Sequence, residues 1–241
     1  MCNLYTYKLS AWEVRNLMEH RKLIGTNFPG SNDPPPERVY PDYVAPVIVH
    51  RSDGKREVHE MRWGFPPFES DPRVRTNVRW PKSKPWIGKW ELGQRCLAPA
   101  IAFSEYQDGP SPKALRWFAR ADGKPFYLAA TWMPWTGVRG KKSAPVEGDH
   151  ELFTFLTTDA NKIVKPVHSK AMPVILTTDA EIEQWLMAPT SDEALELQRA
   201  APDDLMVLLP LEDKTAAERP AAKRKAAPKK PVAKTRVTSK A

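Results

Sequence analysis

Short hydrophobic runs recur along the chain, and each is bounded by Gly, Pro, Asn or Asp. They are five to eight residues long and rich in Val, Ile, Leu and aromatic residues, which is typical of β-strands. The predicted strands are residues 44–50, 56–63, 97–103, 115–120, 125–132, 152–157, 173–177 and 205–209. Many strands with few helices and no repeated βα alternation predict an α+β fold, with a curved, mostly antiparallel sheet or barrel.

A few flanking helices are marked by capping boxes, in which Ser or Thr stands three residues before Glu. Ser10 with Glu13 predicts a helix to about Arg21, and Thr178 and Thr190 begin two later ones. Residues 27–42 contain five Pro and are expected to form a loop. The turn residues Asp108-Gly109-Pro110 and Asp122-Gly123 predict hairpin turns.

The positive charge of this 241-residue chain is concentrated at its C-terminus. Residues 219–241 hold nine Lys or Arg and no acid, so that residues 1–218 carry 28 basic and 29 acidic residues. The end of the chain is built of Ala, Pro and Lys and has little to bury, so we expect it to be disordered. We therefore predict one domain, residues 2–211, and a basic tail, residues 212–241. Such a tail attracts polyanions, or it serves solubility or localisation.

Other features exclude several classes of protein. No run approaches the roughly 18 apolar residues of a membrane span, and no apolar signal region opens the chain, which predicts a soluble cytoplasmic protein without a membrane partner. The two cysteines form no CxxC pair, so neither a disulfide framework nor a zinc site is expected. Cys96 is expected to be a buried core thiol.

The other cysteine, Cys2, directly follows the initiator Met. Removal of Met1 would leave an α-amine and a thiol on adjacent carbons, with reference pKa values of about 8 and about 8.5. Such an aminothiol captures an aldehyde: the amine forms a Schiff base, and the thiolate then closes a five-membered thiazolidine ring. The alternative is that Cys2 is merely a small residue after the start codon.

The stretch from residue 72 to residue 90 has no acidic residue. Positively charged side chains that contact successive phosphates, interleaved with aromatic rings on which bases stack, are typical of single-stranded nucleic acid binding. The alternative is a charged surface loop whose Trp residues anchor it to the core. The residues concerned are Arg73, Arg75, Arg79, Lys82, Lys84 and Lys89, with Trp80, Trp86 and Trp90 between them. Within the stretch, Asn77 is able both to donate and to accept hydrogen bonds.

Two titratable residues stand at the ends of apolar segments. Glu105 lies at the end of the apolar segment 100–106 and is a candidate for a raised pKa and acid–base chemistry; the alternative is an exposed turn residue. Among the five His, His168 is the candidate for a site, because it lies in a loop before an apolar strand. A serine hydrolase is disfavoured, since no G-x-S-x-G elbow surrounds Ser104 or any other Ser.

Six separated motifs resemble, in their order, the SOS-response-associated peptidase (SRAP) family of abasic-site-processing proteins. They are Met1-Cys2, Val44-Ala45-Pro46, Arg62-Trp63-Gly64-Phe65 with Pro67, Asn77-Val78-Arg79, Arg95-Cys96-Leu97-Ala98-Pro99 followed by Glu105-Tyr106, and His168 through Met172-Pro173. The resemblance spans about residues 2–187. The chain departs from the family pattern at Asn3, Tyr43, Phe68 and Lys170, and the last motif is one residue longer.

The resemblance implies a catalytic set of Cys2, Asn77, Glu105 and His168. It implies that Cys2 crosslinks to an abasic site in single-stranded DNA, a lyase-like reaction that needs no cofactor and follows removal of Met1 or a propeptide. His168 would assist sugar ring opening, Glu105 would move protons and Asn77 would orient the amine. The DNA contacts expected are Arg73, Arg75, Arg79, Trp80, Lys82, Lys84 and Lys170. A monomeric, nucleoid-associated bacterial protein is expected.

Two other classes stay open at this point. A thiol peptidase would pair Cys2 with His168 and act on peptides without DNA. A non-catalytic nucleic-acid-binding protein would act through its basic tail and would bind without Cys2.

Overall fold

The computed structural model describes residues 2–7, 38–50, 56–68, 73–141 and 143–211. The predicted first helix, most of the predicted Pro-rich loop and the predicted tail lie outside these residues. The chain divides into a unit of Met1–Pro210 and a second unit of Leu211–Ala241.

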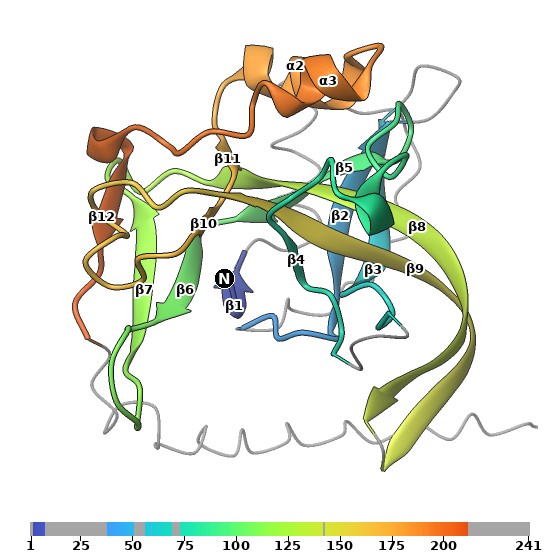
Figure 1. Cartoon of the computed structure of the whole chain (residues 1–241), viewed down its shortest axis with the longest axis horizontal. Helices are drawn as coiled ribbons and strands as arrows, with labels where there is room; N and C mark the ends of the chain where they lie inside the picture. The colour runs from blue at the N-terminus through green and yellow to red at the C-terminus, as the bar shows by residue number, and fades with distance from the viewer. Residues whose placement is uncertain (1, 8–37, 51–55, 69–72, 142, 212–241) are drawn as a thin grey trace, which may run out of the picture. The chain divides into compact units, whose positions relative to one another are not determined.

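The centre of this unit is a closed five-stranded β-barrel (Figure 1). Its strands bond in the circular order β9–β3–β2–β5–β8–β9, and only the β3–β9 pairing is parallel. The mostly antiparallel α+β barrel expected from the hydrophobic pattern is therefore confirmed. The strands are β2 (Val44–His50), β3 (Arg56–Trp63), β5 (Arg95–Ala100), β8 (Phe126–Lys141) and β9 (Ala144–Thr158).

Further short strands extend the barrel and form a second sheet. The strand β4 (Asn77–Val78) pairs in parallel with β9, while β10 (Met172–Pro173) and β11 (Ile175–Leu176) pair with β9 and β8. A separate antiparallel sheet has the order β1-β6-β7-β12. Its strands are β1 (Leu4–Thr6), β6 (Ala102–Tyr106), β7 (Leu115–Arg120) and β12 (Met206–Leu208).

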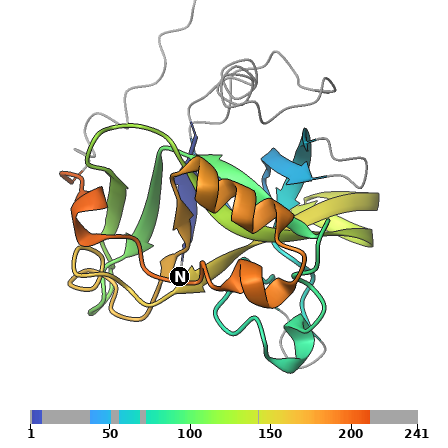
Figure 2. The same ribbon diagram turned by 90° about the horizontal axis from the view of Figure 1, so that it is seen from above.

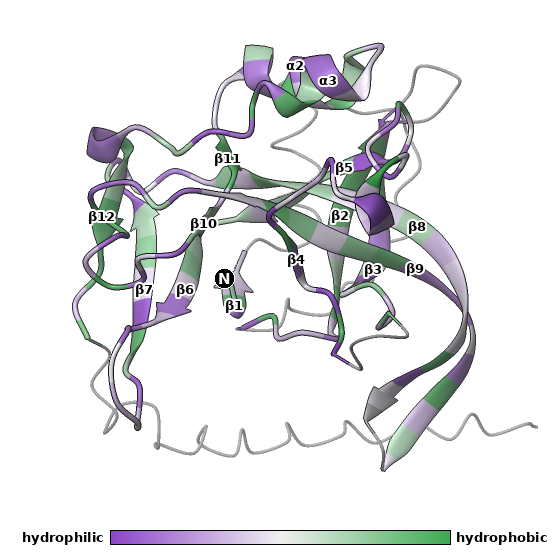
Figure 3. Cartoon of the chain, viewed as in Figure 1, coloured by the Kyte–Doolittle hydropathy of each residue, from purple (hydrophilic) through white to green (hydrophobic). Residues whose placement is uncertain are grey.

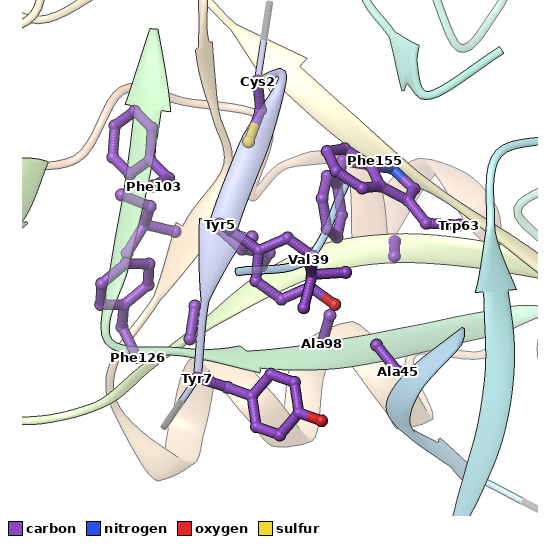
Figure 4. Close-up of a cluster of buried hydrophobic side chains, with 14 of the residues drawn as sticks. Cys2, Tyr5, Tyr7, Val39, Ala45, Trp63, Ala98, Phe103, Phe126 and Phe155 are labelled. Atoms are coloured by element: carbon purple, nitrogen blue, oxygen red, sulfur yellow. The ribbon is translucent and has the colours of Figure 1, made fainter. Parts of the chain in front are cut away.

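The barrel strands are buried on both faces, because successive side chains enter different cores. In β2, Val47 and Val49 belong to one cluster and Ile48 to another. The first cluster contains Tyr5, Trp63 and Phe155, whose ring centroids lie 4.9–5.4 Å apart (Figure 4). Such aromatic packing contributes beyond the burial of area alone.

Two helices cover the second core. They are α2 (Asp179–Met187), which lies across the barrel strands, and α3 (Ser191–Leu195) (Figure 2). Thr178 and Glu181 form the predicted capping box of α2, and Thr190 caps α3. Both helices carry hydrophilic and hydrophobic residues (Figure 3), as expected for helices with one face on a core.

The side chain of Arg95, in β5, is fully buried. It connects α2 to the barrel through hydrogen bonds to backbone carbonyl groups. Its Nε donates to the carbonyl oxygen of Trp185 at 2.6 Å and its Nη1 to that of Trp90 at 2.7 Å. Its Nη2 donates to the carbonyl oxygen of Ala188, where α2 has ended. The guanidinium thus satisfies carbonyl groups that a helix end leaves without partners.

Several predicted elements differ in the structure. The run 97–103 divides at Ile101, whose N–H donates to Thr6, and so contributes to both sheets. The turn Asp122-Gly123 joins β7 to β8 in different sheets and is not a hairpin turn. The strands β8 and β9 extend far beyond the predicted 125–132 and 152–157, because they continue as a two-stranded ribbon with many exposed positions and no one-sided hydrophobic pattern.

Two short 3-10 helices complete the described elements. They are η1 (Lys84–Trp86), which lies within the basic stretch, and η2 (Asp203–Leu205), which precedes β12.

Candidate active site

The pairing of β1 with β6 brings Cys2 beside the end of β6 (Figure 1). Leu4 stands opposite Ser104, and the N–H of Asn3 donates to the carbonyl oxygen of Ser104 at 3.5 Å. Cys2 is fully buried and belongs to the same cluster as Tyr5 (Figure 4). Its Sγ lies 3.6 Å from the carbonyl oxygen of Leu4 and donates to it. The second residue of the chain is therefore a fixed part of the fold.

Asn77 contacts the backbone of Cys2 from β4. The parallel pairing of β4 with β9 places Asn77 opposite Phe155. Its Nδ2 donates to the carbonyl oxygen of Cys2 at 2.9 Å and to Oγ1 of Thr76 at 2.8 Å. Its Oδ1 is buried and has no hydrogen-bond partner among the described residues. Asn77 thus holds the backbone of Cys2 and keeps one acceptor for a further donor.

Glu105 is the last buried residue of β6, and its side chain has no exposed surface. Burial destabilises the ionised carboxylate, and the negative charge of Asp108 acts in the same direction, so that the pKa of Glu105 rises to about 7. At neutral pH, protonated and ionised forms are both populated. This is the property expected of a group that gives and takes protons.

The thiol of Cys2 differs from the expectation based on its reference pKa. Burial raises the pKa of this thiol well above its usual range, and the negative charge of Glu105 raises it further. Almost no thiolate exists at neutral pH in this buried state. Reaction at the sulfur therefore requires a base that removes its proton, and Glu105 is the ionisable group whose charge acts on it most.

His168 faces the same carboxylate from the loop between β9 and β10. Its Nε2 lies 4.0 Å from Oε2 of Glu105. The carbonyl oxygen of Val164 accepts hydrogen bonds from the N–H groups of Val167 and His168, both at 2.9 Å, which folds the loop into a turn. Burial lowers the pKa of His168, so the neutral imidazole prevails near pH 7.

Two residues that organise this loop were not singled out in the sequence. Asp108, taken only as part of a turn, lies 3.4 Å from Nδ1 of His168 through its Oδ1. Asn161 accepts from the N–H groups of Ile163 and Val164 through Oδ1, and its Nδ2 donates to the carbonyl oxygen of Ala201. Asn161 has a local signal, because Asn often bonds the backbone two residues on. Asp108 has none, since its partner lies 60 residues away.

The three Trp residues of the basic stretch separate into two kinds. Trp86 and Trp90 are buried in the second core, so for these two the anchoring alternative is correct. Trp80 is 69% exposed, and the guanidinium of Arg79 lies 5.2 Å from its ring centroid. Ser83 donates to the carbonyl oxygen of Trp80 from both its N–H and its hydroxyl group, which fixes the turn that carries the ring.

The basic residues are placed less uniformly. Arg79 forms an ion pair with Asp159, and Nζ of Lys82 lies 2.6 Å from Oδ1 of Asp192. The guanidinium of Arg75 lies 4.7 Å from the ring centroid of Phe68. Arg79 lies two residues after Asn77, on the segment that contacts Cys2, whereas the other cations lie along the adjoining loop or, for one, beside His168. Exposed side chains among the predicted DNA contacts are those of Arg73, Trp80, Lys82, Lys84 and Lys170.

Within the part of the chain that the structure describes, no group of three or more His, Cys, Asp or Glu side chains could hold a metal ion. Nor do the described residues include a helix that is long and apolar enough to cross a bilayer.

Comparison with known proteins places this site in context. Residues 1–216 match the family described as SOS response associated peptidase (SRAP). Among curated proteins, none matches the sequence.

Solved structures share the fold. A protein from Bordetella bronchiseptica is 22% identical with a TM-score of 0.66, over 86% of this chain and 98% of its own. One from Bacteroides thetaiotaomicron is 20% identical with a TM-score of 0.68, over 91% and 100%. A phage-related protein from Bordetella bronchiseptica is 16% identical with a TM-score of 0.62, over 88% and 95%.

Proposed function

Because the chain belongs to the SOS response associated peptidase family, we propose that it forms a covalent crosslink with abasic sites in single-stranded DNA through Cys2. The observation that carries this proposal is the convergence of four chain segments on one point. Asn77 bonds to the backbone of Cys2, and His168 faces Glu105 beside it. The crosslink would shield the lesion during the response to DNA damage.

The reaction needs only groups that the chain and the sugar provide. After removal of Met1, the α-amine of Cys2 attacks the aldehyde of the ring-opened sugar, and one water leaves as the imine forms. The sulfur then adds to the imine carbon, and the thiol proton passes to the nitrogen. The product is a thiazolidine in which both new bonds to the former aldehyde carbon come from Cys2.

The buried carboxyl group suits the proton transfers of this sequence. With a pKa of about 7, Glu105 can accept the thiol proton in one step and protonate the departing hydroxyl group in another. His168 is available as a neutral imidazole on the other side of Glu105, where it assists opening of the sugar ring. The free Oδ1 of Asn77 is a suitable acceptor for the α-amine.

The surroundings supply contacts for a single strand. Trp80 offers an exposed ring three residues from Asn77, a separation of at most about 10 Å in an extended chain. A base next to the abasic site could stack on this ring. Arg79 and the exposed Lys82, Lys84 and Lys170 are suited to phosphates, which position the strand without reading its sequence.

The experiment compares the wild-type protein with Cys2→Ser and with Cys96→Ser, its buried cysteine control. Each is mixed with a single-stranded oligonucleotide that carries one abasic site, and with the same oligonucleotide without the lesion. Denaturing gels should show a crosslink only with the lesion, for the wild type and Cys96→Ser. A stable crosslink of Cys2→Ser would contradict the proposal, and cleavage of peptides without DNA would favour a peptidase instead.

A further inference from the structure

Asp108 is locked in place beside His168 by the loop that carries the histidine. Its Oδ2 accepts hydrogen bonds from the N–H and the hydroxyl group of Ser169, each at 2.8 Å. Its own N–H donates to the carbonyl oxygen of Val167 at 2.7 Å. Asp108 therefore bonds to the residues on both sides of His168, to Ser169 through its carboxylate and to Val167 through its backbone N–H. Its second oxygen, Oδ1, is left 3.4 Å from Nδ1 of the imidazole.

The two ring nitrogens of His168 therefore face two different carboxyl groups. Nδ1 faces Asp108, and Nε2 faces Glu105 at 4.0 Å. In a neutral imidazole one nitrogen carries the proton and the other a lone pair, and the hydrogen bond at one nitrogen selects the form. A carboxylate only accepts, so a neighbouring carboxylate selects the form that carries its proton on Nδ1.

We propose that Asp108 is a positioning residue, which holds His168 as the Nδ1–H tautomer with the lone pair of Nε2 directed at Glu105. The proposal rests on the function proposed above, because it assigns how His168 is prepared for that reaction. With Nε2 unprotonated, His168 takes a proton from the carboxylic acid form of Glu105. Glu105 is then a carboxylate that can accept the proton of the Cys2 thiol.

The charges around His168 agree with this role. Hydrogen bonds from Ser169 hold the pKa of Asp108 at about 2, so this group is a carboxylate throughout the neutral range. Burial and the positive charge of the N-terminal amine lower the pKa of His168 most; the charge of Asp108 raises it, and Lys170 lowers it further. Glu105 faces the other ring nitrogen, and Lys113 lowers the pKa of Asp108. The negative charge at Nδ1 thus keeps His168 able to receive a proton.

The test uses Asp108→Asn, which is nearly the same shape. The amide oxygen can accept the bonds from Ser169, and the NH₂ group then faces His168 and requires a lone pair on Nδ1. The imidazole should change to the Nε2–H tautomer. Full-length protein labelled with ¹⁵N at histidine reports this directly through the two ring nitrogen shifts. The His168 signals are identified by their loss in His168→Gln.

We expect the Nδ1–H form in the wild type and in Asp122→Asn, an exposed carboxylate control, and the Nε2–H form in Asp108→Asn. Crosslinking by Asp108→Asn should slow by at least about 10-fold, which is less than the ~10²–10⁴-fold range for loss of a general acid or base, because His168 itself remains. Its pH optimum should move to lower pH, and Asp108→Glu should recover part of the rate. An Nε2–H wild type, an unchanged tautomer in Asp108→Asn, or a changed tautomer with an unchanged rate overturns the proposal.

The two proposals fail in different ways. If the wild type forms no crosslink while the tautomer responds to Asp108→Asn, the proposed function is wrong and the coupling of Asp108 to His168 stands. If crosslinking occurs while the tautomer does not respond, the role of Asp108 is wrong and the function stands.

Discussion

Asn77 donates a hydrogen bond from Nδ2 to the backbone carbonyl oxygen of Cys2 at 2.9 Å. This contact joins β4, which pairs with the barrel strand β9, to the second residue of the chain. A chain terminus is often poorly ordered unless it is tied down. Here the carbonyl group of Cys2 is held by the barrel, so the backbone of the residue whose amine and thiol are to react is fixed.

Asn77→Ala should therefore slow crosslinking without changing its pH dependence. Loss of the donor to Cys2 misplaces the nucleophile, and an error of about 1 Å can cost about 100-fold in rate. Because an amide does not titrate, the pH–rate profile should keep its shape. Time courses at several pH values with one abasic oligonucleotide measure both effects. A wild-type rate in Asn77→Ala would show that the contact does not serve the reaction.

Glu105→Gln should make stability less sensitive to pH. The pKa of Glu105 is raised from 4.5 to about 7 in the folded state, so the folded protein binds more protons than the unfolded chain between these values. The contribution of Glu105 is complete below about pH 4.5 and is lost as the pH rises through about 7. At pH 8 the variant should gain on the order of 3 kcal/mol relative to the wild type, at about 1.4 kcal/mol for each pKa unit.

Urea unfolding at about pH 4.5, 6 and 8, values that span the unfolded and the folded pKa of Glu105, measures this effect. The control is Glu147→Gln, an exposed carboxylate on the β8–β9 ribbon, which should follow the wild type. Equal slopes of stability against pH in Glu105→Gln and the wild type would contradict a raised pKa at Glu105.

Trp80→Ala should weaken binding of undamaged single-stranded DNA. Stacking of one base on an aromatic side chain contributes about 1–3 kcal/mol, which corresponds to a loss of about 5- to 150-fold in affinity. Trp80→Phe should keep most of the affinity. Ile87→Ala removes another exposed apolar side chain from the same stretch and is the control. Fluorescence anisotropy gives the dissociation constants, and equal values for Trp80→Ala and Ile87→Ala would exclude stacking on Trp80.

Deletion of residues 219–241 should weaken DNA association and leave the crosslink intact. The deletion removes nine positive charges and none of the proposed catalytic groups. Fewer released counterions should flatten the dependence of affinity on salt. Binding from low to moderate salt and crosslinking at saturating protein measure the two effects. Loss of crosslinking at saturation would place the tail within the site.

The hydrophobic pattern predicted well the strands that form one short hydrophobic run between turn residues. The predicted boundaries of β2 and β3 agree with the structure, because turn residues flank two runs that are buried at most of their positions. The ribbon formed by the outer parts of β8 and β9 could not be recognised in this way. Its hydrogen bonds are made between the two strands themselves, and exposed residues such as Val138 and Val146 do not mark an inner face.

The site was predicted from the sequence only as far as each residue carries its own signal. Cys2 is marked by its position, and Glu105 and His168 are marked by the apolar segments beside them; the resemblance to the family indicated these residues together with Asn77. The apolar segment that contains Glu105 predicted a raised pKa, but the extent of its burial depends on the pairing of β6 with β1, which no local pattern measures. Asp108 faces His168 only because two distant loops meet, so a turn motif was all that the sequence could indicate.

The central claim is that the mature protein reacts through both nucleophiles of Cys2. Intact-mass analysis after mixing with an oligonucleotide that carries one abasic site tests it most directly, followed by peptide mapping of the adduct. We predict a protein that lacks Met1, joined to the oligonucleotide with the loss of one water, and the link mapped to Cys2. An adduct that retains Met1, or a link mapped to another residue, would contradict the account.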